Sequence, residues 1–143
     1  MQYKGQLAPL APEVIKVSLA RQTNADVAEF IRRNFINAMR NGETLRYDIE
    51  SLSPDFAAYT VEGTFVAEKF FDWNFMNERD NYMPYVREEE NHGIGGINPG
   101  IGYIRSDNFV MVIRGSADDE EHLNQQISKI PNFYTHFHHV IIQ

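Results

Sequence analysis

Residues 101–143 have the sequence IGYIRSDNFVMVIRGSADDEEHLNQQISKIPNFYTHFHHVIIQ, which gives the clearest indication of the fold. Two runs rich in β-branched and aromatic residues, 103–105 and 109–113, flank the polar turn Ser106-Asp107-Asn108. Strand-forming residues on both sides of a short Ser/Asp/Asn turn are typical of a β-hairpin. We therefore predict two antiparallel strands here.

A helix and a final strand are expected after this hairpin. Ser116 is the predicted N-cap, the carboxylates of 118–121 occupy the first turn, where the helix dipole favours them, and Pro131 ends the helix. Tyr134–Ile142 then has the composition of a last strand. The order strand, strand, helix, strand predicts an α+β fold, with two or three helices packed on a mainly antiparallel sheet.

Upstream, the segment 24–41 gives the strongest helix signal. Thr23 is a predicted N-cap with Asp26 three residues later, the apolar residues recur at helical spacing, and Gly42 follows as a C-terminal cap. In 44–50 the apolar and polar residues alternate, which predicts a half-buried strand.

Three further segments give weaker signals. Residues 14–19 and 56–61 are interpreted as strands, and 66–77 as a helix. The aromatic residues between 56 and 75 are expected to form core, because such clusters are far more often core than ligand sites.

A chain of 143 residues is long enough to bury one core. We expect an extended N-terminal arm over residues 1–13, which contain Pro9 and Pro12, and one α+β domain over 14–143. Within that domain the polar, glycine-rich stretch 78–100 is predicted to be a long loop.

The net charge is −7 and is unevenly distributed. Residues 1–50 contain seven basic and six acidic side chains, whereas residues 51–143 contain six and fourteen. An acidic chain is a poor match for a phosphate backbone, so a nucleic-acid partner is not expected. No apolar run is long enough to suggest a membrane partner, and the absence of cysteine and of a signal-peptide pattern favours a cytoplasmic or other intracellular location.

Two histidines form the strongest candidate for metal chemistry. On the predicted last strand, His136 and His138 would point to the same side and could both ligate a zinc ion. A zinc site needs three or four ligands, and the sequence names only two. A metal-dependent enzyme is therefore an alternative, while the main expectation is that no cofactor is bound.

A glycine-rich tract over 91–102 is a second candidate. It lacks the features of a dinucleotide or phosphate loop, since Asn98 stands where the third glycine is needed and a strand is expected to follow. A small-ligand loop remains an alternative, with these residues as contacts: His92, Gly93, Gly95, Gly96 and Asn98.

The preferred hypothesis is a non-enzymatic protein-interaction or assembly subunit, self-associating as a homo-oligomer or bound to a larger protein partner. The arm offers apolar side chains on a backbone that its prolines restrict, which lowers the ordering cost of docking. The basic face of helix 24–41 could meet the acidic runs of another copy. The predicted partner-binding residues are Tyr3, Leu7, Leu10, Arg32, Arg33 and Arg40.

Overall fold

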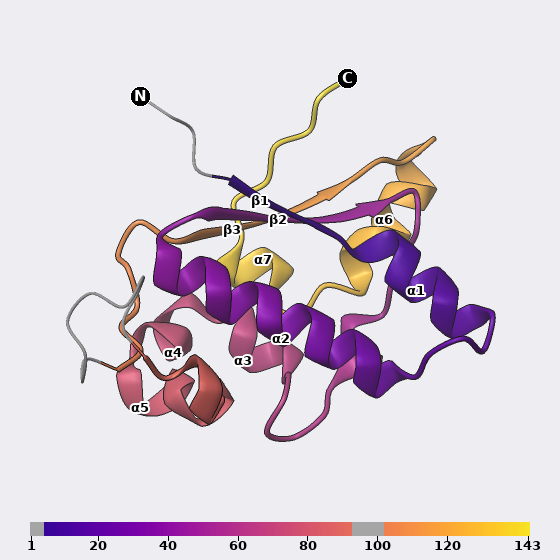
Figure 1. The fold of residues 1–143 in the computed structure, drawn as a ribbon. Helices are drawn as coiled ribbons and strands as arrows, with labels where there is room; N and C mark the ends of the chain where they lie inside the picture. The colour runs from indigo at the N-terminus through magenta and orange to yellow at the C-terminus, as the bar shows by residue number, and fades with distance from the viewer. Residues whose placement is uncertain (1–4, 93–101) are drawn as a thin grey trace.

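A computed structural model describes residues 5–92 and 102–143, and these form an α+β fold around a three-stranded sheet. The strands are β1 (Gly5–Pro9), β2 (Thr44–Glu50) and β3 (Val110–Gly115), in the order β1-β2-β3. Figure 1 shows the sheet above and most helices below it. Within the described residues, no helix has the length and apolar character needed to span a membrane.

The sheet is parallel, so the prediction of a mainly antiparallel sheet is wrong. Both strand pairs, β1 with β2 and β2 with β3, run in the same direction. Parallel neighbours cannot be joined by a tight turn and need long crossovers, here residues 10–43 and 51–109. The predicted hairpin is absent because residues 103–105 form no strand and β3 pairs with β2 instead.

The first crossover corrects the prediction for the N-terminal region. Gly5–Pro9 is an edge strand, and α1 (Leu10–Ser18) follows it directly, so residues 14–19 are mainly helical rather than a strand. Pro12 is tolerated because it lies in the first turn, where backbone N–H groups have no partner within the helix. From Gly5 onward, the predicted arm is part of the sheet and of α1.

The next two elements are confirmed. α2 (Asn24–Asn41) begins at Thr23 with the predicted capping box, in which Thr23 and Asp26 bond each other's backbone N–H. Hydrogen bonds donated to the Asp26 carboxylate by the backbone N–H and the hydroxyl of Thr23 lower the pKa of that carboxyl. β2 alternates as expected, with its apolar side chains buried: Leu45, Tyr47 and Ile49.

The second crossover is a chain of short helices. They are η1 (Phe56–Tyr59), α3 (Ala67–Phe70), α4 (Trp73–Asn77), α5 (Arg79–Tyr82), η2 (Met83–Tyr85) and η3 (Glu88–Glu90). The predicted strand over 56–61 is therefore wrong, and the predicted helix over 66–77 is two helices divided by the N-cap Asp72. The described part of the predicted 78–100 loop contains helical turns up to Glu90.

The C-terminal region differs most from expectation. α6 (Glu120–Ser128) begins at Asp119 rather than Ser116, because the Asp119 side chain accepts from the His122 backbone N–H. The last segment forms the short helix α7 (Phe133–His136) and then continues without strand pairing, so the predicted strand Tyr134–Ile142 is wrong.

The core lies between the lower face of the sheet and the helices. Phe56, Phe65, Phe70 and Phe71 are buried there, as predicted for this aromatic segment, whereas Trp73, also predicted as core, is 44% exposed. Two buried tyrosines join other parts of the fold to α2 by hydrogen bonds to its backbone carbonyls. The hydroxyl of Tyr47, in β2, donates to Ile31 O (2.7 Å), and that of Tyr103, in the segment before β3, donates to Ile36 O (2.6 Å). Burial raises the pKa of both phenols.

The turn after α2 yields a stability prediction. Gly42 has a φ of 67°, and a Cβ there would lie 2.5 Å from Ser106 Oγ and within 3.3 Å of two further side-chain carbons. Gly63 has a similar φ of 79° with open space around it. Gly63→Ala should therefore cost only the backbone strain, about 1–2 kcal/mol. Gly42→Ala should cost at least ~1 kcal/mol more, because the turn must also accommodate the new methyl group.

Urea unfolding of both variants measures this difference. Equal losses of unfolding free energy in the two variants would show that the turn at Gly42 relaxes freely away from residues 106–108.

Candidate interaction surface

Among residues 5–92 and 102–143, no helix lies over the upper face of the sheet (Figure 1). Side chains alternate along each strand, and the pairing register places Leu7, Arg46 and Val112 side by side on this face, all exposed. Val110 lies on the same face and is also exposed. Parallel sheets are normally covered on both faces, so a parallel sheet with one open face is unusual. We call this surface, formed by the upward-pointing residues of β1, β2 and β3, the outer face.

The outer face is partly apolar and is not acidic. Leu7, Val110 and Val112 are 53%, 49% and 38% exposed. Its charged side chains include Asp48, whose carboxylate accepts from Arg114 across the sheet at 3.2 Å. By alternation along β2 and β3, this face carries Arg46 and Arg114 against Asp48 and Glu50, so its charges balance, although the whole chain carries a net charge of −7.

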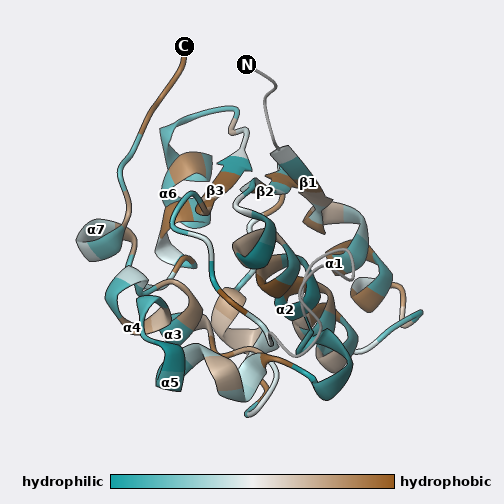
Figure 2. Ribbon diagram, turned by 60° about the vertical axis from the view of Figure 1, so that its left-hand side comes forward, coloured by the Kyte–Doolittle hydropathy of each residue, from teal (hydrophilic) through white to brown (hydrophobic). Residues whose placement is uncertain are grey.

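The C-terminal segment Val140–Ile142 is a second exposed apolar surface. Its three residues are 85%, 66% and 90% exposed. Figure 2 shows this tail in brown, extending away from the rest of the molecule. Sequence reasoning missed it because the predicted last strand placed these residues in the sheet.

The predicted arm residues have different positions. Leu7 lies on the outer face, Leu10 is fully buried at the start of α1, and Tyr3 lies outside the described residues. Leu7 is therefore exposed to solvent, whereas Leu10 is part of the core.

The three arginines predicted for partner binding also differ in their exposure to solvent. Arg33 is exposed, Arg40 is half-buried, and Arg32 is buried with a side chain that is 2% exposed. Arg32 bonds the carboxylates of Glu29 and Glu90 at 2.7 Å each. Burial by itself lowers the pKa of Arg32, but these bonds outweigh it and raise the pKa above its usual value, while the bond with Arg32 lowers the pKa of Glu29. Arg32 therefore acts within the fold rather than at its surface.

The two histidines of the metal hypothesis do not share a strand face. His136 ends α7 and its Nε2 lies 3.3 Å from Asp72 Oδ1, while His138 is exposed two residues beyond the helix. Across residues 5–92 and 102–143, no three His, Asp or Glu side chains are placed to hold one metal ion.

The predicted ligand loop lies mostly outside the described residues, which exclude Gly93, Gly95, Gly96 and Asn98. His92 is described and exposed. A polar hollow of about 290 Å³ lies along α2, lined by Gln6, Arg33, Asn34, Ile36, Asn37, Arg40 and Glu90. Several of its polar groups are bonded to one another, for example Gln6 Nε2 to Asn34 Oδ1 (2.6 Å) and Arg40 Nη1 to Glu90 O (3.0 Å), which leaves fewer groups for a ligand.

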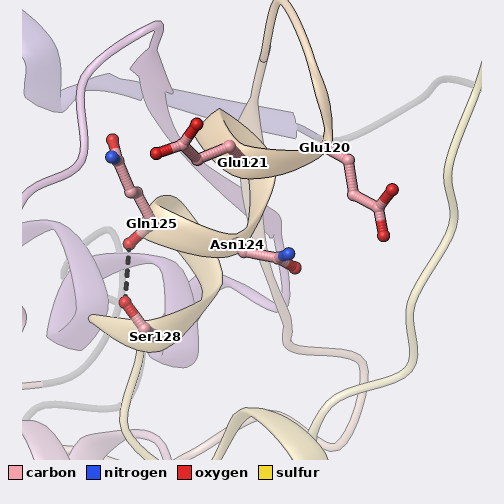
Figure 3. Close-up of a pocket in the computed structure, with 5 residues that line it drawn as sticks. All are labelled: Glu120, Glu121, Asn124, Gln125 and Ser128. Carbon is pink, nitrogen blue, oxygen red and sulfur yellow. Dashed lines mark hydrogen bonds between the residues drawn. The ribbon is translucent and has the colours of Figure 1, made fainter.

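A wider hollow of about 530 Å³ lies along α6 (Figure 3). The residues that line it come from this one helix: Glu120, Glu121, Asn124, Gln125 and Ser128. The two carboxylates point to opposite sides in Figure 3, and Ser128 Oγ donates to the Gln125 carbonyl of its own helix. This hollow is an open helix surface without convergent groups.

The carboxyl ends of the strands, where parallel sheets commonly bind ligands, are closed. Gln126 is buried and its Nε2 donates to the carbonyls of Glu50, Leu52 and Ser116. His122 Nε2 lies 2.7 Å from Ser51 O. Because α6 fills this end of the sheet, the outer face and the tail are the strongest candidates for a functional surface.

Comparison with known proteins gives no relative: no family model, curated protein or solved structure matches this chain.

Proposed function

We propose that this chain is a non-enzymatic assembly subunit that self-associates through the outer face of its sheet. The observation that supports this most is the parallel sheet, which the described helices cover on one face, with Leu7, Val110 and Val112 exposed on the other. Apolar side chains on an otherwise ordered sheet favour a protein partner, because covering them removes apolar area from water.

A second copy is the partner that the charges and the chain itself favour. The outer face lacks the acidic excess of the whole chain, so two acidic molecules can approach there with less repulsion than elsewhere. The chain also carries an exposed apolar segment, Val140–Ile142, that is available for a contact between two copies.

Leu7→Lys tests this proposal against a matched control. Leu7 is 53% exposed on the outer face, and Leu19 is 56% exposed after the end of α1. We expect sedimentation velocity to show oligomers of the unaltered protein at concentrations up to about 100 µM, in the affinity range of weak specific complexes. Leu7→Lys should shift the protein to monomer, and Leu19→Lys should leave its mass distribution unchanged.

Both variants should unfold like the unaltered protein, because neither leucine is buried. A monomeric unaltered protein across the whole concentration range, or equal effects of the two lysines, would contradict self-association through the outer face.

A further inference from the structure

We infer that the segment Val140–Ile142 of one copy packs on the outer face of a second copy. This inference rests on the proposed function and identifies the part of the partner that covers the sheet. It starts from the exposure of the segment: three consecutive β-branched side chains are 66–90% exposed and are left largely uncovered by the described part of their own chain.

The base of the tail is fixed, so its end has a defined direction. The Phe137 ring packs against Phe71 with ring centroids 5.7 Å apart. The His139 ring stacks on Phe133 at 4.0 Å, and its Nε2 lies 3.0 Å from Phe133 O. A segment that is already extended and held at its base loses less freedom on docking than a mobile chain end.

The tail is not placed against its own sheet. Val140 and Ile142 are 85% and 90% exposed, which excludes close packing of these side chains on the sheet of their own chain. A contact with a sheet must therefore be made with another molecule, unless the base of the tail detaches.

The two surfaces match in chemistry. The outer face offers aliphatic side chains, and the tail offers Val140, Ile141 and Ile142. Residues 133–143 contain no Asp, Glu, Lys or Arg, so the tail can approach the outer face without desolvating a charged side chain of its own. β-Branched residues in extended conformation are also well suited to pack on a pleated surface.

Each copy carries one tail and one face, which restricts the possible assemblies. Two copies that exchange tails form a closed dimer with two identical contacts, whereas one-way contacts continue into a ring or a fibre. In either case the tail residue and the face residue that meet belong to different chains.

Disulfide trapping tests this contact directly, because the chain contains no cysteine of its own. One sample carries Ile141→Cys, and a second, extended by an affinity tag, carries Val112→Cys. After mixing and mild oxidation, a tail–face contact should give a mixed disulfide dimer, visible by its mass on a non-reducing gel. Tagged Leu19→Cys replaces Val112→Cys in the control and should give little of this product.

The two cysteines are also placed together in one chain. Rapid closure within that chain, with no product between chains on mixing, would overturn the inference, because the tail would then cover its own sheet. Equal yields with Val112→Cys and Leu19→Cys would overturn it as well.

Substitution separates this inference from the proposed function. Val140→Asp/Ile142→Asp should weaken self-association roughly tenfold or more. Leu19→Asp, at a residue that is 56% exposed after the end of α1, should leave self-association unchanged. If Leu7→Lys dissociates the oligomer but the two aspartates do not, the outer face is the interface and the tail is not its partner. If neither change affects the oligomer, both proposals fail.

Discussion

Replacing Arg32 by methionine is expected to lower the free energy of unfolding by about 3–5 kcal/mol, as when one partner of a buried ion pair is removed. All five N–H donors of Arg32 are used: Nε and Nη2 donate to Glu29, Nη1 to Tyr85 O, and Nη1 and Nη2 to Glu90. The variant leaves the Glu90 carboxylate, whose side chain is 18% exposed, without its main cation. It also removes the bonds that Arg32 forms between α2 and the segment 85–90, and leaves the bond of Arg40 to Glu90 O in place.

Arg33→Met is the matched control, since it makes the same chemical change at the next residue, which is exposed. We expect its effect to stay within about 0.5 kcal/mol. Arg32→Met/Glu90→Gln should regain part of the loss, because the unpaired carboxylate is removed as well. Urea unfolding measures all three variants. A cost below about 1 kcal/mol for Arg32→Met would mean that the desolvation of Arg32 cancels its bonds.

Phe35→Ala is expected to cost about 3–5 kcal/mol, the range for truncating a buried phenylalanine. Phe35 is 2% exposed, and its ring lies 4.9 Å from Phe70 and 5.0 Å from Phe109, measured between centroids. It thus joins α2, the second crossover and the segment before β3. Truncation leaves a cavity at the point where these three parts meet.

Phe30→Ala on the same helix is the control, because Phe30 is only half-buried and should cost clearly less. Trp73, the single tryptophan, stacks on Phe109 at 6.0 Å, so its fluorescence reports on this cluster. An unfolding free energy for Phe35→Ala close to that of the unaltered protein would show that the aromatic cluster closes over the missing ring.

The sequence predicted well where local chemistry decides the structure. The capping box of Thr23 and Asp26 and the terminal Gly42 define α2 within the chain itself, and the alternation in 44–50 depends only on one buried sheet face. These signals involve neighbours in sequence, so they do not depend on which strands pair.

Strand pairing was not predictable from the same signals. Ser106-Asp107-Asn108 marks a turn, but the segment before it is fixed by Tyr103, whose hydroxyl bonds α2, and not by pairing with β3. Val14, Ile15 and Val17 have high β-propensity, yet Leu10, Val14 and Val17 face the core together at helical spacing. Tertiary packing outweighs propensity there.

The candidate surface was predicted only in part. Leu7 was assigned to a partner and lies on the outer face. Val112 was predicted in a strand, as found, but not as part of a partner surface, and Val140–Ile142 were assigned to a last strand that does not form. An apolar β-branched run has the same sequence pattern whether it is buried by its own chain or left for another. Arg32 is the opposite case. The sequence places it on a charged helix face and so suggests an exposed side chain, but Glu90 from a distant segment pairs with it and it is buried.

The order β1-β2-β3 also limits how quickly and in what sequence the chain can fold. β1 and β2 can pair once residues 5–50 have emerged from the ribosome, and that unit already contains the Tyr47–Ile31 hydrogen bond. β3 must then close a loop of about 60 residues onto β2, and such non-local pairing is slow because loop entropy is lost before contacts are gained. During this delay the free edge of β2 is open to strands of other nascent chains, so chaperone protection is most needed from synthesis of β2 until β3 has paired with it.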